Sequence, residues 1–255
     1  MKNAHRSALS RFIRWNNISL PTRQPDIQLL TGLAATAAAL LIISEFLIKL
    51  LMGSRPGLDQ SEALIAYMVQ NTTPTIVVII IDTTLMACLI IFFACFRQLI
   101  VRARHDLNWL VDIAFGASLV FVAVTLVGDS MDAGTVLDTV RLTPDASVIR
   151  ALTEGHMLLF GTIGCVLTSL ITAIFAYATF ASGAVPKWTG WIAYVVALLN
   201  ILAIPTAFGG TSATSFFSAG GAGVALFAIF PFLAWVIAVG IVTFGSKYNT
   251  PISHF

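Results

Sequence analysis

Charge is scarce in this chain. Only 10% of its 255 residues are Asp, Glu, Lys or Arg, whereas soluble domains carry about 25%. Residues 157–186 and 188–246 carry no charge at all, and 58% of the whole chain is apolar. A soluble globular or disordered protein needs more polar surface than this, and the few basic residues exclude nucleic acid as a partner. Since about 20 apolar residues cross the hydrocarbon of a bilayer, the sequence predicts a polytopic membrane protein whose first partner is lipid.

Cysteine and histidine are also rare. The three cysteines, Cys88, Cys95 and Cys165, lie inside apolar runs without Cys-x-x-Cys spacing, so we expect small buried residues rather than a disulfide or a metal site. The four histidines form no His-x-x-x-His or His-Glu-x-x-His pair, which excludes a zinc protease. The sequence predicts no metal and indicates no cofactor.

Six apolar runs predict an all-α bundle of six transmembrane helices. The polar first 26 residues favour a retained first helix over a cleaved signal peptide. We expect a cytoplasmic N-terminal tail (1–26), one transmembrane domain (27–246) and a cytoplasmic C-terminal tail (247–255). The predicted helices cover residues 27–52, 75–99, 107–128, 150–181, 188–207 and 221–245.

Local signals indicate where some helices begin. Thr73-Pro74 and Thr143-Pro144 each combine a capping residue with proline at the first helical position, so the fourth helix is expected to run from Pro144 to Phe180. Asp59 and Glu62 have the spacing of a capping box. This predicts a short interfacial helix, ending near residue 70, that leads into the second span.

Lysine and arginine are unevenly divided between the two sides of the predicted bundle. The two tails, the second loop and the fourth loop hold ten of the fourteen, and the opposite side holds four. The positive-inside rule then predicts both termini in the cytoplasm and a multi-pass protein of the plasma membrane. Most acidic residues fall on the outer side.

Seven polar residues are predicted at similar depth in the outer half of the bundle. Ionisable groups within a span are costly and are functional candidates by default. We therefore expect an outward-facing polar pocket with a possible lid at residues 209–221. Its candidate ligand-binding or proton-coupled residues are Glu45, Lys49, Asp82, Asp129, Glu154, His156 and Asn200.

Simpler roles compete with this interpretation. Glu45 and Lys49, four residues apart, can form an ion pair that reaches the interface. Asp129 and Asp132 can cap the third helix as ordinary solvated carboxylates, and Glu154 can be solvated likewise. Asp82 is harder to explain, because it has apolar neighbours and no basic residue one turn away. Asp112 is expected to form a structural ion pair with Arg102 or Arg104.

One turn and one helix carry a resemblance. Residues 182–191 (SGAVPKWTGW) and Pro231-Phe232-Leu233-Ala234-Trp235 with Gly240 resemble the mid-protein turn and last helix of a bacterial family known only as a domain of unknown function, number four-three-eight-six. The resemblance implies six helices and a bacterial inner membrane. It implies no catalytic residues.

Three functions remain open. The first is binding or conduction of a small ligand or ion through the outward-facing cavity, coupled to protonation of Asp82. The second is a membrane-embedded isomerase or cyclase acting on a lipidic substrate, with Asp82 and Glu154 or His156 as acid and base. The third is an assembly subunit that packs against other membrane subunits or a second copy through its alanine-rich residues 34–39. Polarity on both sides favours transport, and a cavity open to lipid favours the enzyme.

Overall fold

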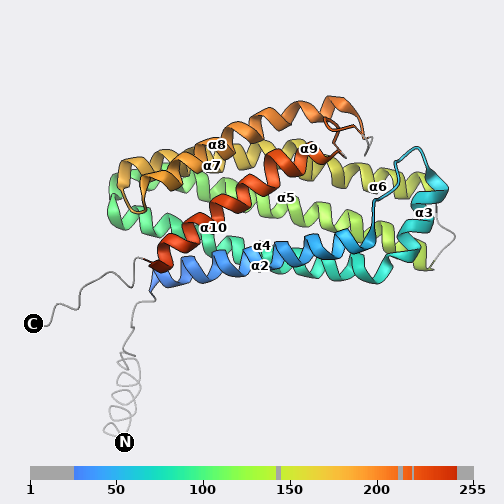
Figure 1. Cartoon of the computed structure of the whole chain (residues 1–255), viewed down its shortest axis with the longest axis horizontal. Helices are drawn as coiled ribbons and strands as arrows, with labels where there is room; N and C mark the ends of the chain where they lie inside the picture. Colours follow the sequence, from blue (N-terminus) through green and yellow to red (C-terminus); the bar gives the residue numbers. More distant parts are fainter. Residues whose placement is uncertain (1–25, 142–144, 212–214, 220, 246–255) are drawn as a thin grey trace, which may run out of the picture.

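A computed structural model describes residues 26–141, 145–211, 215–219 and 221–245, and these form a bundle of helices (Figure 1). Six helical segments are long and apolar enough to cross a membrane, which confirms the predicted all-α membrane fold. The elements are α2 (Ile27–Met52), α3 (Ser61–Gln70), α4 (Thr72–Ala103), η1 (His105–Leu107), α5 (Asn108–Arg141), α6 (Ala146–Leu158), η2 (Leu159–Ile163), α7 (Gly164–Ser182), α8 (Lys187–Ala203), η3 (Ile204–Gly209), α9 (Ala222–Val224), η4 (Ala225–Ile229) and α10 (Phe230–Gly245).

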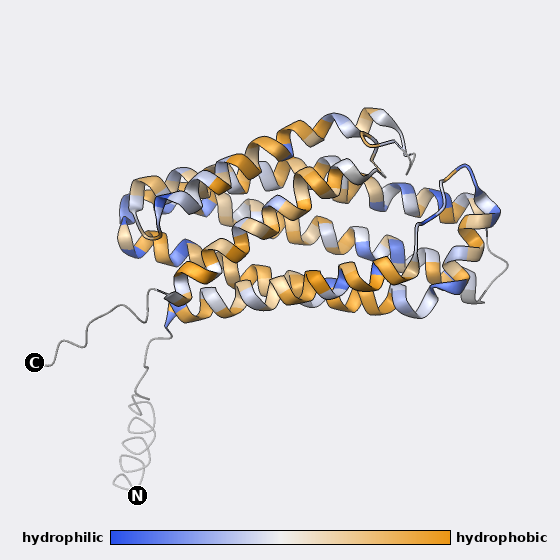
Figure 2. Ribbon diagram, viewed as in Figure 1, coloured by the Kyte–Doolittle hydropathy of each residue, from blue (hydrophilic) through white to orange (hydrophobic). Residues whose placement is uncertain are grey.

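The hydrophobic residues follow the long axis of the bundle. In Figure 2 the middle of the helices is mostly hydrophobic, and hydrophilic residues concentrate at the two ends. The first residue of α2 and the last residue of α10 lie at one end, which we call the terminal end, and α3 lies at the other, the α3 end (Figure 1). Hydrophilic residues within the spans are therefore few and conspicuous.

Small residues bring α2 and α10 close together. Ala34, Ala35 and Ala38 on α2 are buried, and a Cβ placed on Gly240 would lie 2.7 Å from the Cβ of Ala35. Such close approach is what small residues allow in membrane bundles. Much of the alanine-rich run thus packs inside the chain, which removes the main argument for an assembly subunit.

A cluster of aromatic rings fills the terminal-end half of the bundle. Phe92 and Phe96 of α4, Phe175 of α7 and Trp235 of α10 are all fully buried. The ring of Trp235 lies 5.7 Å from Phe92, 5.9 Å from Phe96 and 6.0 Å from Phe175. These distances are typical of interacting aromatic pairs. The core is therefore well filled on this side, and the space discussed below lies beyond it.

The third span is longer than predicted. We expected it to end near residue 128, with Asp129 and Asp132 as capping residues, but α5 continues to Arg141 and both carboxylates are buried within it. The extra turns are stabilised by α3 and α6, because Val136 packs with Met68 and Ile149 in a small separate core. The solvated-loop interpretation of Asp129 and Asp132 is therefore wrong.

Helix starts agree only in part with the capping signals. The short helix before the second span is present as α3, but its N-cap is Gln60 without a side-chain bond, so the Asp59–Glu62 capping box is wrong. Helix α4 begins before Pro74, at Thr72. Thr143 and Pro144 lie outside the described residues. Helix α6 is capped by Asp145, whose carboxylate accepts a hydrogen bond from the Ser147 backbone N–H, and this bond lowers the pKa of Asp145.

The predicted ion pair of Asp112 has a different partner. Its carboxylate pairs with Arg97, one turn before the end of α4, rather than with Arg102 or Arg104. Arg97 also donates to Asn108 Oδ1 at 2.8 Å. Arg104 instead pairs with Asp106. The structural role expected for Asp112 stands, and it connects α4 to α5 at the terminal end.

Candidate functional site

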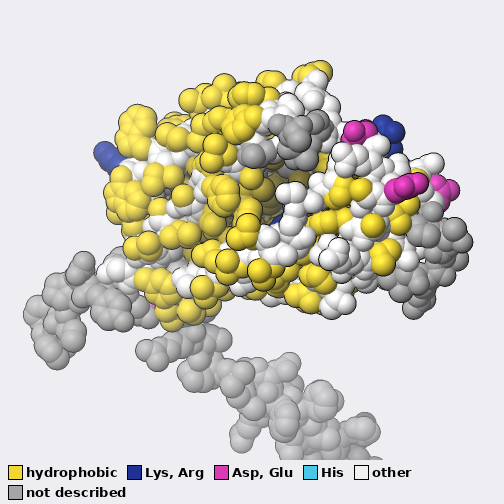
Figure 3. Space-filling view, turned by 45° about the vertical axis from the view of Figure 1, so that its right-hand side comes forward, with side chains coloured by type: hydrophobic (Ala, Val, Ile, Leu, Met, Phe, Trp, Pro, Cys, Tyr) yellow, Lys and Arg dark blue, Asp and Glu magenta, His cyan; other side chains and the backbone are white. Residues whose placement is uncertain are grey.

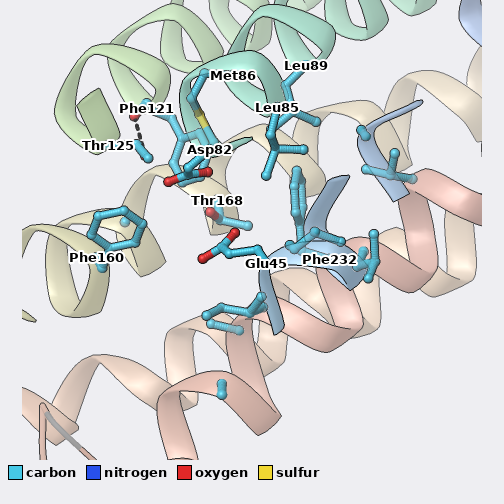
Figure 4. Close-up of a pocket in the computed structure, with 18 of the residues that line it drawn as sticks. Glu45, Asp82, Leu85, Met86, Leu89, Phe121, Thr125, Phe160, Thr168 and Phe232 are labelled. Atoms are coloured by element: carbon cyan, nitrogen blue, oxygen red, sulfur yellow. Dashed lines mark hydrogen bonds between the residues drawn. The ribbon is translucent and has the colours of Figure 1, made fainter. Parts of the chain in front are cut away.

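A cavity of about 180 Å³ lies on the α3 side of the aromatic cluster. All six spans contribute to its wall, which is largely apolar: Ile42 of α2, Leu85 and Leu89 of α4, Phe121 of α5 and Phe232 of α10 are examples (Figure 4). Figure 3 shows a hollow in the side of the bundle with a mostly hydrophobic rim. The space is thus accessible from the region that faces lipid.

One end of the cavity is polar. Glu45 of α2 and Asp82 of α4 point into the same space, and Asn200 of α8 also lines it (Figure 4). Their exposed fractions are 7%, 4% and 0%. Burial this deep is rare for charged side chains unless they are paired. The structure therefore brings together three of the predicted site residues at one end of an apolar cavity.

Asp129 adds a second carboxyl beside Asp82. The extra length of α5 places the two side chains within hydrogen-bonding contact of each other. Two carboxylates at such a distance cannot both be ionised, so the pair must hold at least one proton. Asp129 is only 6% exposed, and its Oδ2 has no hydrogen-bond partner. We call Asp82 and Asp129 the acid pair.

Lys49 closes the polar end of the cavity. Its Nζ lies 2.5 Å from Glu45 Oε1, so the predicted i, i+4 ion pair is present. Lys49 also lines a second cavity of about 210 Å³ at the α3 end, together with Arg55, Asp132 and His156. The side chain is therefore a shared wall between an apolar cavity and a polar one.

The second cavity is held by an ion pair that sequence reasoning missed. Arg55 Nη2 donates to both carboxylate oxygens of Asp132, at 2.8 and 3.0 Å. The side chains are only 20% and 12% exposed. Tyr67 also lines this cavity, and burial raises its pKa. Arg55 was noted only as a loop residue, and the Asp129-x-x-Asp132 spacing gives one helix face only if α5 is known to continue.

His156 and Glu154 are not in the apolar cavity. His156 lines the second cavity, where its Nδ1 lies 3.0 Å from the carbonyl oxygen of Gly128 and its ring lies 4.6 Å from that of Phe160. Since a carbonyl only accepts, Nδ1 carries the hydrogen. Glu154 is half-buried on α6 and lines neither cavity. The single pocket that we predicted is therefore two cavities.

Asn200 offers an acceptor to the apolar cavity. Its Nδ2 donates to the Val196 carbonyl at 2.9 Å, which fixes the orientation of the amide. The Oδ1 is buried without a hydrogen-bond partner. An unpaired buried acceptor costs about 1–3 kcal/mol, so a donor arriving from a ligand would relieve it.

Two π-helical segments face this cavity. In the fourth span η2 contributes Phe160, and in the sixth span η4 contributes Ala225, Ala228 and Ile229. Single π turns are rare and occur mostly at functional sites. The lid predicted at residues 209–221 falls partly on residues 212–214 and 220, which lie outside the described residues.

The three cysteines are free, as expected, and Cys165 lines the cavity. Within the described ranges no three His, Cys, Asp or Glu side chains are arranged to hold a metal ion. No family model, curated protein or solved structure matches the chain. The conclusion supported by the fold is a multi-span membrane protein.

Proposed function

We propose that this protein binds a small, largely apolar molecule within the membrane and couples that binding to protonation of the acid pair. The observation that carries the proposal is the position of Asp82 and Asp129, two adjacent buried carboxyls at the polar end of an otherwise apolar cavity. An unpaired charge inside a span is costly, so a site that keeps two carboxyls there is expected to use them.

The shape of the cavity favours binding over conduction of ions. Its polar groups lie at one end only, and the aromatic cluster around Trp235 closes the other direction. A path for ions needs polar groups along its length. The predicted coupling to Asp82 is kept, with Asp129 as the partner that the sequence did not reveal.

A second candidate is an enzyme acting on a lipidic substrate. The hollow in the hydrophobic side of the bundle favours it (Figure 3), because such a substrate would enter from the bilayer. In that case Asp82 and Asp129 would serve as acid and base, since Glu154 lies elsewhere. A binder returns its ligand unchanged, whereas an enzyme returns a product, and mass spectrometry of the recovered molecule separates the two.

Infrared spectroscopy tests the shared proton directly. We expect the purified protein to show the C=O stretch of a protonated carboxyl at neutral pH, because the acid pair holds a proton. The signal should change in Asp82→Asn and disappear in the double variant Asp82→Asn/Asp129→Asn. Glu154→Gln is the matched control and should leave it unchanged. A spectrum without a protonated carboxyl, or one insensitive to both aspartates, would overturn the proposal.

Orientation is part of the same proposal. The distribution of Lys and Arg supports cytoplasmic termini, and the resemblance at residues 182–191 supports a bacterial inner membrane. In a background lacking the native cysteines, Arg102→Cys should resist an impermeant thiol reagent applied from outside, whereas Asp138→Cys should react. The reverse labelling pattern would sink the orientation and place the acid pair nearer the cytoplasm.

A further inference from the structure

We infer that the occupant of the apolar cavity is an amphipathic organic cation, an apolar body carrying an ammonium group, whose charge replaces the shared proton of the acid pair. This inference rests on the proposed function and names its ligand class. It is argued from the charges at the polar end, the unpaired acceptors there and the lining of the rest of the cavity.

Charged and titratable groups reach the polar end from every element packed around it. They belong to α2, the segment after it, α4, α5 and α6: Glu45, Lys49, Arg55, Asp82, Asp129, Asp132 and His156.

Most of these charges cancel in pairs. Lys49 neutralises Glu45, and Arg55 neutralises Asp132. His156 directs its Nδ1–H at the Gly128 carbonyl and faces the second cavity. The acid pair is what remains. With one shared proton it keeps one negative charge, which has no cation of its own among the described residues.

The unpaired polar atoms all accept hydrogen bonds. Asn200 Oδ1 lines the cavity, Asp129 Oδ2 lies beside it, and both are buried without a partner. An ammonium group donates three hydrogen bonds and accepts none, so it complements both the acceptors and the charge. A carboxylate or phosphate group would meet acceptors and a negative charge, and we expect it to be excluded.

The remainder of the cavity suits an apolar body. Leu85, Met86 and Leu89 line one wall, and Phe121 and Phe232 contribute ring surface. Aromatic faces attract cations as well as apolar groups. The hollow in the side of the bundle gives an amphipathic molecule a route from the bilayer (Figure 3). Ligand sites in proteins commonly combine such an apolar lining with a few placed polar groups.

The exchange conserves charge. An ammonium ion that settles between Asp82 and Asp129 brings one positive charge, and the shared proton leaves to solvent. The acid pair then carries two negative charges, balanced in part by the ligand as they were by the proton. We therefore expect release of about one proton for each ammonium bound, as in any linkage between protonation and binding.

Three ligands with one apolar chain separate the effect of the head group. Isothermal titration calorimetry on the full chain in lipid nanodiscs would compare n-octylamine, n-octanol and sodium octanoate. We expect octylamine to bind at least about tenfold more tightly than octanol, as a charge-assisted hydrogen bond implies, and octanoate to show no binding. Titrations in buffers of different ionisation heat should give the proton released with octylamine.

Variants distinguish the site from partition into lipid. Asp82→Asn should lose the proton release and most of the preference for octylamine, while Glu154→Gln should keep both. Octylamine heats that are equal in all variants would mean partition into lipid alone and would overturn the inference. Equal affinity for octanol or octanoate would overturn the ligand class while leaving the proposed function standing. Loss of the infrared carboxyl signal would instead remove the proposed function itself.

Discussion

Asp82→Leu is expected to abolish ligand binding and its coupled proton release while leaving the thermal unfolding midpoint within a few degrees of the parent protein. Asp82 is buried and its neighbours Leu85 and Met86 are apolar, so leucine fits the surroundings. Replacing a buried charged group by a hydrophobe of similar volume is often neutral or stabilising. Asp129 then loses its partner and is expected to remain protonated. Binding by calorimetry and unfolding by tryptophan fluorescence check the two parts.

Asp82→Asn separates shape from titration. It keeps a hydrogen bond to Asp129 but cannot gain or lose a proton, so binding is expected to persist weakly without proton release. The conservative and the apolar variant thus differ in a way that a structural role would not produce. If Asp82→Leu prevents folding while Asp82→Asn matches the parent in every assay, Asp82 is a structural hydrogen-bond partner and the assignment is wrong.

Arg55→Met is expected to give the largest loss of stability, on the order of 3 kcal/mol, because it leaves the Asp132 carboxylate buried without its cation. We place the loss at the lower end of the range for buried pairs since Arg55 and Asp132 are still 20% and 12% exposed. The ion pair connects the segment after α2 to the extra turns of α5. Reversible unfolding in sodium dodecyl sulfate measures the change in free energy.

The double variant Arg55→Met/Asp132→Leu provides the control. Removing both charges leaves no buried carboxylate unpaired, so it should recover most of the lost stability. Arg104→Met, at the exposed pair with Asp106, should change the free energy of unfolding little. Equal losses from the single and double variants at Arg55 and Asp132 would show that packing, and not charge, is responsible.

Hydropathy predicts the spans well because it sums over some twenty residues, so single errors do not matter. The first span, 27–52, agrees with α2 at both ends. The third does not, because Asp129 and Asp132 make residues beyond 128 resemble a loop. Only contacts from distant residues such as Met68 and Ile149 keep that segment helical.

The site was predictable in part for a related reason. Glu45, Lys49 and Asp82 stand out as charges within apolar runs, which the sequence displays directly. Pairing between Asp82 and Asp129 depends on the rotation and depth of two helices, which it does not display. Glu154 and His156 are two residues apart, so they point to different sides of α6 and cannot both line one cavity.

The π turns η2 and η4 have a consequence for the phase of the chain. Each turn holds one residue more than an α-helix would, and one residue corresponds to about 100° of rotation. Deleting a residue from Leu159–Ile163 would turn the part of the fourth span that follows, carrying Cys165 and Thr168 out of the cavity wall. A deletion in Ala225–Ile229 would do the same to Phe232. The lining of this cavity therefore depends on the number of residues in two short segments as much as on which residues they are.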